Sequence, residues 1–349
     1  MRNRIASLII VAIGVGLAVW FIRRLDWQVV GEHLRGIRVW PVVLAALLIN
    51  FTLLLRSLRW RTLLAPIARV GLGSLFSATT IGFGSVFVFG RAGEIVRPMV
   101  LSLKERLHPS ATVATILVER VFDMAAVATF FAVNLLFFRL PHGQGVETGT
   151  LDTIHSVGLL LTVATVAGIA VLILFRVRTA WIVEKLEART KRFPQRLVRP
   201  IIGFISHLSS GLSVLLNLRE LLICVFYTVL VWSCVTGATW LVLIAFRLDL
   251  GLTSAVFVMG FGLLGSLVPS PGGSAGAFHA AAAAGLIFLG IERNLAASAA
   301  IVFHFVAFGP PFVLGMFYLV KDGIRLGSLR EMIASSKTED SESSSSVSD

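Results

Sequence analysis

Long apolar stretches constrain this chain more than any other feature of its sequence. A helix needs about 20 mostly apolar residues to cross the hydrocarbon core of a bilayer. The alternation typical of membrane-spanning strands is absent from the sequence, so helices are left to satisfy the backbone hydrogen bonds in lipid. The six stretches closest to full crossings are residues 5–22, 39–55, 111–138, 155–175, 220–246 and 296–320. The sequence therefore predicts an all-α, polytopic membrane protein.

Two further apolar regions, residues 72–102 and 251–290, are interrupted midway by glycine and proline. The interruptions are Gly82, Gly84, Gly90 and Gly93 in the first region, and Gly260, Gly262, Gly265, Pro269, Pro271, Gly272, Gly273 and Gly276 in the second. Such breaks are typical of two short half-helices, or of a re-entrant hairpin with a non-helical tip. Two such hairpins and six full spans give about eight hydrophobic segments.

A span, an interrupted region and a second span occur twice in that order. In the predicted topology the first unit, 39–138, and the second unit, 220–320, cross the membrane in opposite orientations, which suggests an inverted repeat. The integral membrane domain is predicted to cover residues 1–333. The Ser-rich, acidic segment 334–349 has almost nothing to bury and is predicted to be a disordered tail.

Basic residues indicate the orientation of the chain rather than a nucleic-acid partner. The net charge is +12, but 56% of the residues are hydrophobic and the basic ones gather in short segments beside the spans. With six crossings and two hairpins, three basic groups fall on one side, which the positive-inside rule makes cytoplasmic. They are Arg56, Arg59, Arg61 and Arg69, then residues 176–199, then Lys321, Arg325 and Arg330. We expect a multi-pass protein of the cell (inner) membrane with both termini in the cytoplasm.

Six charged residues lie within or beside predicted membrane segments. They are Arg91, Glu94, Arg97, Glu119, Arg120 and Asp123. Each charge costs roughly 2.5–3.5 kcal/mol at the bilayer centre, so these side chains are expected to face protein, water or a polar ligand. In one interpretation the arginines bind an anionic headgroup, since guanidinium grips phosphate at two points. In the other, the six charges balance to zero and form a network that pins the first hairpin to the next helix.

The break in the second region, Pro269 to Gly276, has two interpretations of its own. The prolines and glycines stop one half-helix, and Ser274 is placed to cap the next. A half-helix that begins at membrane depth offers free N–H groups and a positive dipole end to an anion. The alternative is a tight packing turn that needs glycine for steric reasons.

Two histidines, His279 and His304, fall inside predicted membrane segments. His279 is expected to face the hairpin tip. His304 precedes Gly309-Pro310-Pro311, which is expected to kink the last span. Either histidine could be a hydrogen-bonded structural residue or a proton carrier.

Three ordered motifs connect these features: Arg91-Ala92-Gly93-Glu94-x-x-Arg97, Glu119-Arg120-x-x-Asp123 and Pro269-x-Pro271-Gly272-Gly273-x-x-Gly276. Together they resemble the lysylphosphatidylglycerol synthase transmembrane region family, also called flippase-like, over nearly the whole chain from the second span to Lys321. In the multiple peptide resistance factors, this region resembles a module that moves aminoacylated phosphatidylglycerol between leaflets and is fused to a soluble aminoacyl-transfer domain. The chain lacks that domain, so the resemblance implies a stand-alone member without synthase activity.

The motifs and the resemblance predict a lipid flippase or transporter for phospholipid or glycolipid headgroups, with anionic or zwitterionic membrane lipids as partners. The alternative is a non-transporting scaffold, or an accessory subunit of an enzyme of envelope-lipid or glycolipid biosynthesis. No nucleophile or metal-ligand set is identifiable, so we expect no enzyme activity, no cofactor and no metal. The expected substrate-binding residues are Arg91, Glu94, Arg97, Glu119, Arg120, Asp123, Pro271, Gly272, Gly273, His279 and His304.

Overall fold

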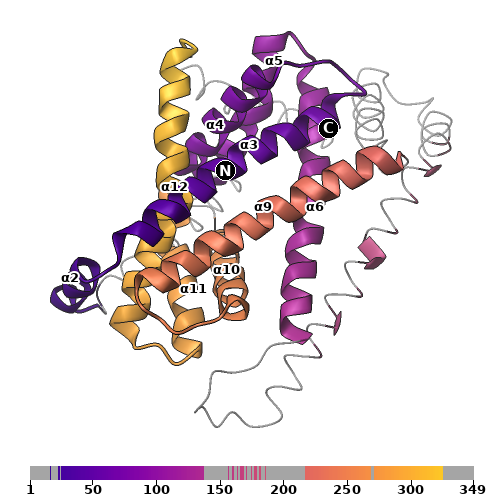
Figure 1. The fold of residues 1–349 in the computed structure, drawn as a ribbon. Coiled ribbons are helices and arrows are strands. Elements are labelled where there is room, and N and C mark those ends of the chain that lie inside the picture. Colours follow the sequence, from indigo (N-terminus) through magenta and orange to yellow (C-terminus); the bar gives the residue numbers. More distant parts are fainter. Residues whose placement is uncertain are drawn as a thin grey trace, which may run out of the picture.

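A computed structural model describes residues 25–136, 217–268 and 271–324, with isolated positions within 16–23 and 156–185. Over these residues every regular element is a helix, which confirms the all-α class (Figure 1). The elements are α2 (Trp27–Arg35), α3 (Val39–Leu64), α4 (Leu72–Phe89), the 3₁₀ turn η1 (Gly90–Ile95), α5 (Val96–Glu105), α6 (Pro109–Leu136), α9 (Leu218–Ala245), α10 (Leu252–Gly265), α11 (Pro271–Phe288) and α12 (Arg293–Lys321).

Four of the described helices, α3, α4, α9 and α12, are long and apolar enough to cross a membrane, so the chain is a multi-pass membrane protein. Helices α3, α6, α9 and α12 coincide with four predicted spans. The predicted spans 5–22 and 155–175 and the tail 334–349 lie outside the described residues.

Helix α4 differs from the expected half-helix, because its 18 residues continue through Gly82 and Gly84. A glycine inside a helix costs only about 1 kcal/mol, so tertiary packing can override it. The chain leaves the helix at Gly90, whose positive φ of 59° suits a residue without a Cβ atom.

The prediction that Arg56, Arg59 and Arg61 follow the second span, in a short segment beside it, is wrong. Helix α3 runs on to Leu64 and carries all three side chains. The helix can continue because Arg56 and Arg59 have carboxylate partners inside the protein, which removes the cost of leaving them unpaired in an apolar environment.

Helices α3 and α9 lie side by side and run in opposite directions (Figure 1). At one end the amide of Arg38 donates to the carbonyl of Ala245 over 3.0 Å. Farther along, Arg59 Nη1 donates to Thr228 Oγ1 over 2.8 Å. An inverted repeat requires this antiparallel relation between the first helices of its two units; the symmetry of the whole units stays a prediction.

Both interrupted regions fold back on themselves as helical hairpins. In the first, Lys104 near the end of α5 donates to Ser77 near the start of α4 over 3.1 Å. In the second, Gly265 at the end of α10 packs so closely on α11 that an added Cβ atom would lie 2.5 Å from the Ala277 carbonyl oxygen. The sides from which the hairpins enter the membrane stay predictions.

The first hairpin is joined to the end of α12 by an ion pair. Lys104 Nζ lies 2.6 Å from Asp322 Oδ2, and the hydroxyl of Ser77 donates to the same oxygen. Burial alone would raise the pKa of Asp322, but the hydrogen bonds from Lys104 and Ser77 and the nearby lysine charges hold this pKa below its usual value. This contact fixes the ends of α5 and α12 on the same side of the protein.

Helices α4 and α12 pack closely at Gly315, where there is no room for a larger residue. A Cβ atom at Gly315 would lie 2.5 Å from the carbonyl oxygen of Thr80 and 3.0 Å from Gly84 Cα. We expect Gly315→Ala to destabilise the protein by about 1–3 kcal/mol, the usual cost of overpacking. Gly237→Ala is the matched control, because the nearest atom there, Leu48 Cδ1, is 3.7 Å away. Equal thermal unfolding temperatures for the two variants in detergent would contradict this packing.

Candidate functional site

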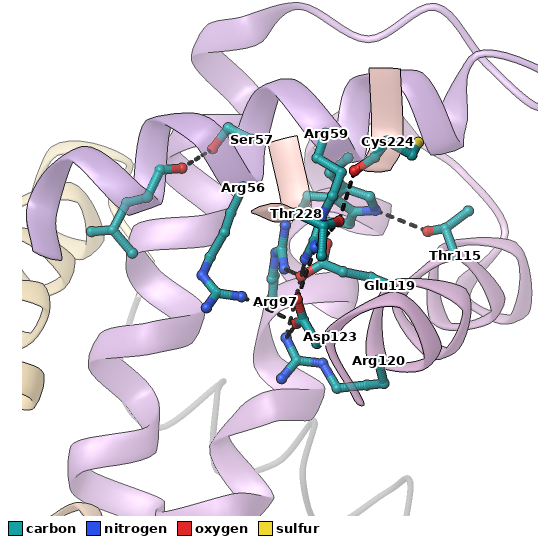
Figure 2. A network of polar contacts seen from close by, with 12 residues as sticks. Arg56, Ser57, Arg59, Arg97, Thr115, Glu119, Arg120, Asp123, Cys224 and Thr228 are labelled. Atoms are coloured by element: carbon teal, nitrogen blue, oxygen red, sulfur yellow. Dashed lines mark hydrogen bonds and ion pairs between the residues drawn. The ribbon is translucent and has the colours of Figure 1, made fainter. Parts of the chain in front are cut away.

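Four arginines from three helices converge on two carboxylates of α6 (Figure 2). Glu119 and Asp123 lie four residues apart, so they share one face of that helix. The four arginines are Arg56 and Arg59 of α3, Arg97 of α5 and Arg120 of α6. We call these six residues the charged cluster.

Arg59 lies at the centre of the charged cluster and is fully buried. Its Nη1 is 2.8 Å from Asp123 Oδ1, and its Nη2 is 3.2 Å from Glu119 Oε1. Nη1 also donates to Thr228 Oγ1, which in turn donates to the carbonyl of Cys224 over 2.7 Å. These contacts tie α3, α6 and α9 together, so Arg59 holds the fold at this point.

Arg97 is backed by an aromatic ring. Its Nη1 lies 2.6 Å from Glu119 Oε1, and its guanidinium carbon lies 4.2 Å from the centre of the Trp60 ring. The indole N–H of Trp60 donates to Thr115 Oγ1 over 2.9 Å, which fixes the ring plane. A guanidinium stacked in this way keeps its edge available for a planar acceptor.

Arg56 lies between two aromatic rings. Its Nη1 is 3.2 Å from Asp123 Oδ2, and its guanidinium carbon is 5.0 Å from the centre of the Phe83 ring and 5.8 Å from that of Trp232. The indole N–H of Trp232 donates to Asp123 Oδ1 over 3.2 Å. Asp123 therefore orients both the arginine and one of the rings that cover it.

Arg120 is the most exposed member of the charged cluster, with 34% of its side chain accessible. Its Nη2 lies 3.2 Å from Glu119 Oε1 and 3.4 Å from Asp123 Oδ2. The predicted set of Arg91, Glu94, Arg97, Glu119, Arg120 and Asp123 balanced to zero because it omitted Arg56 and Arg59. The charged cluster itself carries four positive and two negative charges, a surplus of two.

Hydrogen-bond donors in the charged cluster outnumber acceptors. Four guanidinium groups carry about 20 N–H donors, whereas two carboxylates offer about eight acceptor sites. Among the described residues, no acceptor is found for the buried Nε of any of the four arginines or for Nη2 of Arg97, and one buried acceptor, Glu119 Oε2, finds no donor. Leaving buried donors without acceptors costs free energy, so the charged cluster has the capacity to bind additional acceptor atoms.

A cavity of about 250 Å³ lies beside the charged cluster. Arg56, Arg97 and Arg120 line it, together with Glu94 of η1. The lining also includes Gly273 and Ser274 of α11, Phe308 of α12 and Trp232 of α9. The turns of both hairpins therefore meet at one cavity, with charged groups supplied by the first hairpin and neighbouring helices.

The turn of the second hairpin has a left-handed backbone. Gly272, Gly273 and Ser274 have φ of 72°, 63° and 61°. Two of these positions are glycine, which adopts positive φ without a steric penalty. The predicted capping role of Ser274 is wrong, because its hydroxyl points back and donates to the carbonyl of Val268 over 2.6 Å. It closes the end of α10 instead of accepting from the first turn of α11.

His304 supports this turn from α12. Its Nε2 lies 3.3 Å from the carbonyl oxygen of Gly273, and its ring centre is 4.6 Å from that of His279. The described lining of the cavity includes neither histidine. His304 is therefore connected to the cavity only indirectly, through its contact with the backbone of Gly273, which lines the cavity.

The predicted site residues whose side chains the structure describes fall into three groups. Glu94, Arg97, Arg120 and Gly273 line the cavity, whereas Glu119 and Asp123 lie behind it as counter-ions. Gly272 is part of the turn, His304 contacts the turn at the Gly273 carbonyl, and His279 packs on His304. The side chains of Arg91 and Pro271 lie outside the described part of the structure.

Five contributors escaped the sequence-based interpretation: Arg56, Arg59, Trp60, Phe83 and Trp232. One signal was present, because Arg56 and Arg59 are three residues apart and so share a helix face if the span continues past residue 55. Tryptophan and phenylalanine in membrane segments carry no comparable signal, since they usually pack or lie at the interface.

Within the described residues, no three or more His, Cys, Asp or Glu side chains are grouped so that they could hold a metal ion. A family model described as Lysylphosphatidylglycerol synthase TM region matches residues 5–315. The match includes every member of the charged cluster and every residue that lines the cavity. No curated protein matches the chain.

Proposed function

Because the chain belongs to the lysylphosphatidylglycerol synthase TM region family, we propose that it takes a lipid headgroup into its cavity and moves it between leaflets. The family and the spanning helices support a role in lipid handling within the membrane. The ligand would be a phospholipid or glycolipid whose headgroup contains phosphate. Its acyl chains would stay in the bilayer while the headgroup crosses through the protein.

The donor surplus of the charged cluster carries this proposal. Arg56 and Arg97 both line the cavity, have 7% and 3% of their surface exposed, and hold N–H groups without acceptors among the described residues. A phosphate group offers several acceptor oxygens and negative charge, and it matches the planar edge of guanidinium at two points. A bound phosphate would therefore satisfy donors that the protein leaves open.

Transport is favoured over catalysis by the state of the carboxylates. Glu119 contacts three arginines, and Asp123 contacts three arginines and the indole of Trp232. Neither carboxylate is among the residues that line the cavity, so neither is placed to exchange a proton with a ligand there. We therefore propose that the protein is not an enzyme and that Glu119 and Asp123 orient the arginines.

The proposed setting is the cell membrane, with the ends of α5 and α12 on the cytoplasmic side. Lys104 and Lys321 lie at these ends, and their charge agrees with the positive-inside rule. Arg56 and Arg59 no longer support this orientation, because both are buried inside the protein. Accessibility of single cysteines at the two helix ends would test it.

Retention of lipid during gentle purification tests the proposed function. We expect wild-type protein to carry phosphate-containing lipid in native mass spectrometry, and Arg56→Gln to carry at least about tenfold less, since a hydrogen bond to a charged group contributes about 1.5–3 kcal/mol. Arg61→Gln is the matched control, because Arg61 lies on the same helix and is exposed.

Equal retention by wild type and Arg56→Gln would contradict phosphate binding in the cavity. A stable complex with a glycosyltransferase, combined with no bound lipid, would instead favour the accessory role. The two functions are therefore separated by what co-purifies with the protein.

A further inference from the structure

One carboxylate at the cavity differs from the two in the charged cluster. Glu94 lines the cavity and is half-buried. Glu119 and Asp123 are each held in direct contact by arginines, whereas among the described residues Glu94 forms no ion pair or hydrogen bond and interacts with the charge of Arg120 only at longer range. Among the described residues, the cavity thus presents an acceptor without a hydrogen-bond donor beside donors without acceptors.

The position of Glu94 is well defined by the backbone around it. The residue lies in η1, between two helices that pack against each other. Gly93, next to it, is so close to α4 that an added Cβ atom would lie 2.5 Å from the Ser85 carbonyl carbon and oxygen. Glu94 is also three residues before Arg97, so an acceptor and a donor lie on adjoining parts of one short segment.

A ligand that fits this cavity needs two kinds of group. Its phosphate oxygens would accept from Arg56 and Arg97, and a neighbouring hydroxyl or ammonium would donate to Glu94. We propose that Glu94 is a specificity-determining residue that selects phosphodiester headgroups carrying a hydrogen-bond donor next to the phosphate. This inference rests on the proposed function, because it assigns a second contact to the same bound headgroup.

The net charge around the cavity also favours a phosphodiester. The charged cluster has a surplus of two positive charges, and Glu94 reduces it to one. A phosphodiester carries one negative charge and neutralises that remainder. A phosphomonoester brings more negative charge close to Glu94, and like charges repel strongly where water is excluded.

Four lipids with identical acyl chains separate these chemistries. Phosphatidylglycerol offers hydroxyl donors, and phosphatidylethanolamine offers ammonium donors. Phosphatidylcholine keeps the positive charge but has no N–H, and phosphatidic acid is a monoester without a donor-bearing head. We expect the full-length protein in detergent, offered all four in equal amounts, to retain the two donor lipids about tenfold over phosphatidylcholine and phosphatidic acid in native mass spectrometry.

Variants at Glu94 make the test specific. We expect Glu94→Ala to abolish the preference while total lipid retention persists, because the arginines still hold the phosphate. Glu94→Gln keeps an acceptor but loses the charge, so it should retain phosphatidylglycerol if a hydroxyl is the natural donor, and should lose phosphatidylethanolamine selectively if an ammonium is. Glu32→Gln is the control, because Glu32 is exposed on α2.

The possible outcomes separate the role of Glu94 from lipid binding itself. Wild-type protein that retains lipid without preferring donor headgroups overturns the role of Glu94 and leaves the proposed function standing. An unchanged preference in Glu94→Ala, with an unchanged unfolding temperature, overturns it as well. Wild-type protein that retains no lipid at all overturns both.

Discussion

Glu119→Ala is expected to lower the free energy of unfolding by about 3–5 kcal/mol, the usual cost of breaking a buried ion pair by removing one partner. Glu119 is fully buried, and its Oε1 lies 2.6 Å from Arg97 Nη1, 3.2 Å from Arg59 Nη2 and 3.2 Å from Arg120 Nη2. Its removal leaves Asp123 as the remaining carboxylate for four guanidinium groups. Repulsion among them then adds to the loss of the contacts.

Thermal unfolding in detergent, followed by tryptophan fluorescence, measures this effect. Glu32→Ala provides the control, since it removes an exposed carboxylate of α2 and is expected to change stability by less than about 0.5 kcal/mol. If Glu119→Ala unfolds at the same temperature as Glu32→Ala, the charged cluster does not hold the fold together.

Arg97→Lys is expected to slow lipid transfer at least about tenfold with little change in stability. Lysine keeps the positive charge near Glu119, but it loses the planar guanidinium, whose face stacks on Trp60 and whose Nη2 has no acceptor among the described residues. One lost hydrogen bond to a charged group corresponds to about 1.5–3 kcal/mol, or about 10- to 100-fold. The measurement is the rate at which labelled phospholipid changes leaflet in proteoliposomes.

Arg219→Lys controls for a general effect of the exchange, because Arg219 is exposed at the start of α9. Transfer by Arg97→Lys at the wild-type rate would mean that the site needs only a positive charge at this position. Planar recognition of phosphate by Arg97 would then be wrong, although a looser electrostatic role would remain.

The helical architecture follows from features that the sequence displays directly. Runs of about 20 apolar residues leave few alternatives in lipid, and glycine and proline mark where the two hairpins turn. The contacts made by the side chains at these turns could not be predicted from the sequence in the same way. Ser274 illustrates this, because a serine before a helix usually accepts from its first turn, whereas a left-handed backbone at three successive residues turns this hydroxyl to the preceding helix.

The charged cluster was predicted only in part, for a reason that lies in its three-dimensional arrangement. Glu119 and Asp123 are visible as an i, i+4 pair, but two of their partners, Arg56 and Arg59, are 60 or more residues away in the sequence. The positive-inside rule places arginines after an apolar run in a loop, and here that rule competes with burial against carboxylates. Pairing across helices decides the outcome, and it is not encoded in local spacing.

The two sequence-based interpretations of the charged residues apply to different members. Arg59, fully buried and bound to Glu119, Asp123 and Thr228, is placed to hold helices together. Arg56 and Arg97 line the cavity and keep unsatisfied N–H groups. A network can therefore be structural at its centre and, as we propose, bind ligand at its edge.

Leaflet transfer by the wild-type protein tests the central claim most directly. Purified protein is reconstituted into liposomes that contain phospholipid with a fluorescent acyl chain, and the fraction of label accessible to an external quencher is followed over time. The account predicts that label moves between leaflets faster than in protein-free liposomes prepared in the same way. Equal rates in the two preparations, with folded protein in the bilayer, would contradict a transport function and favour the accessory role.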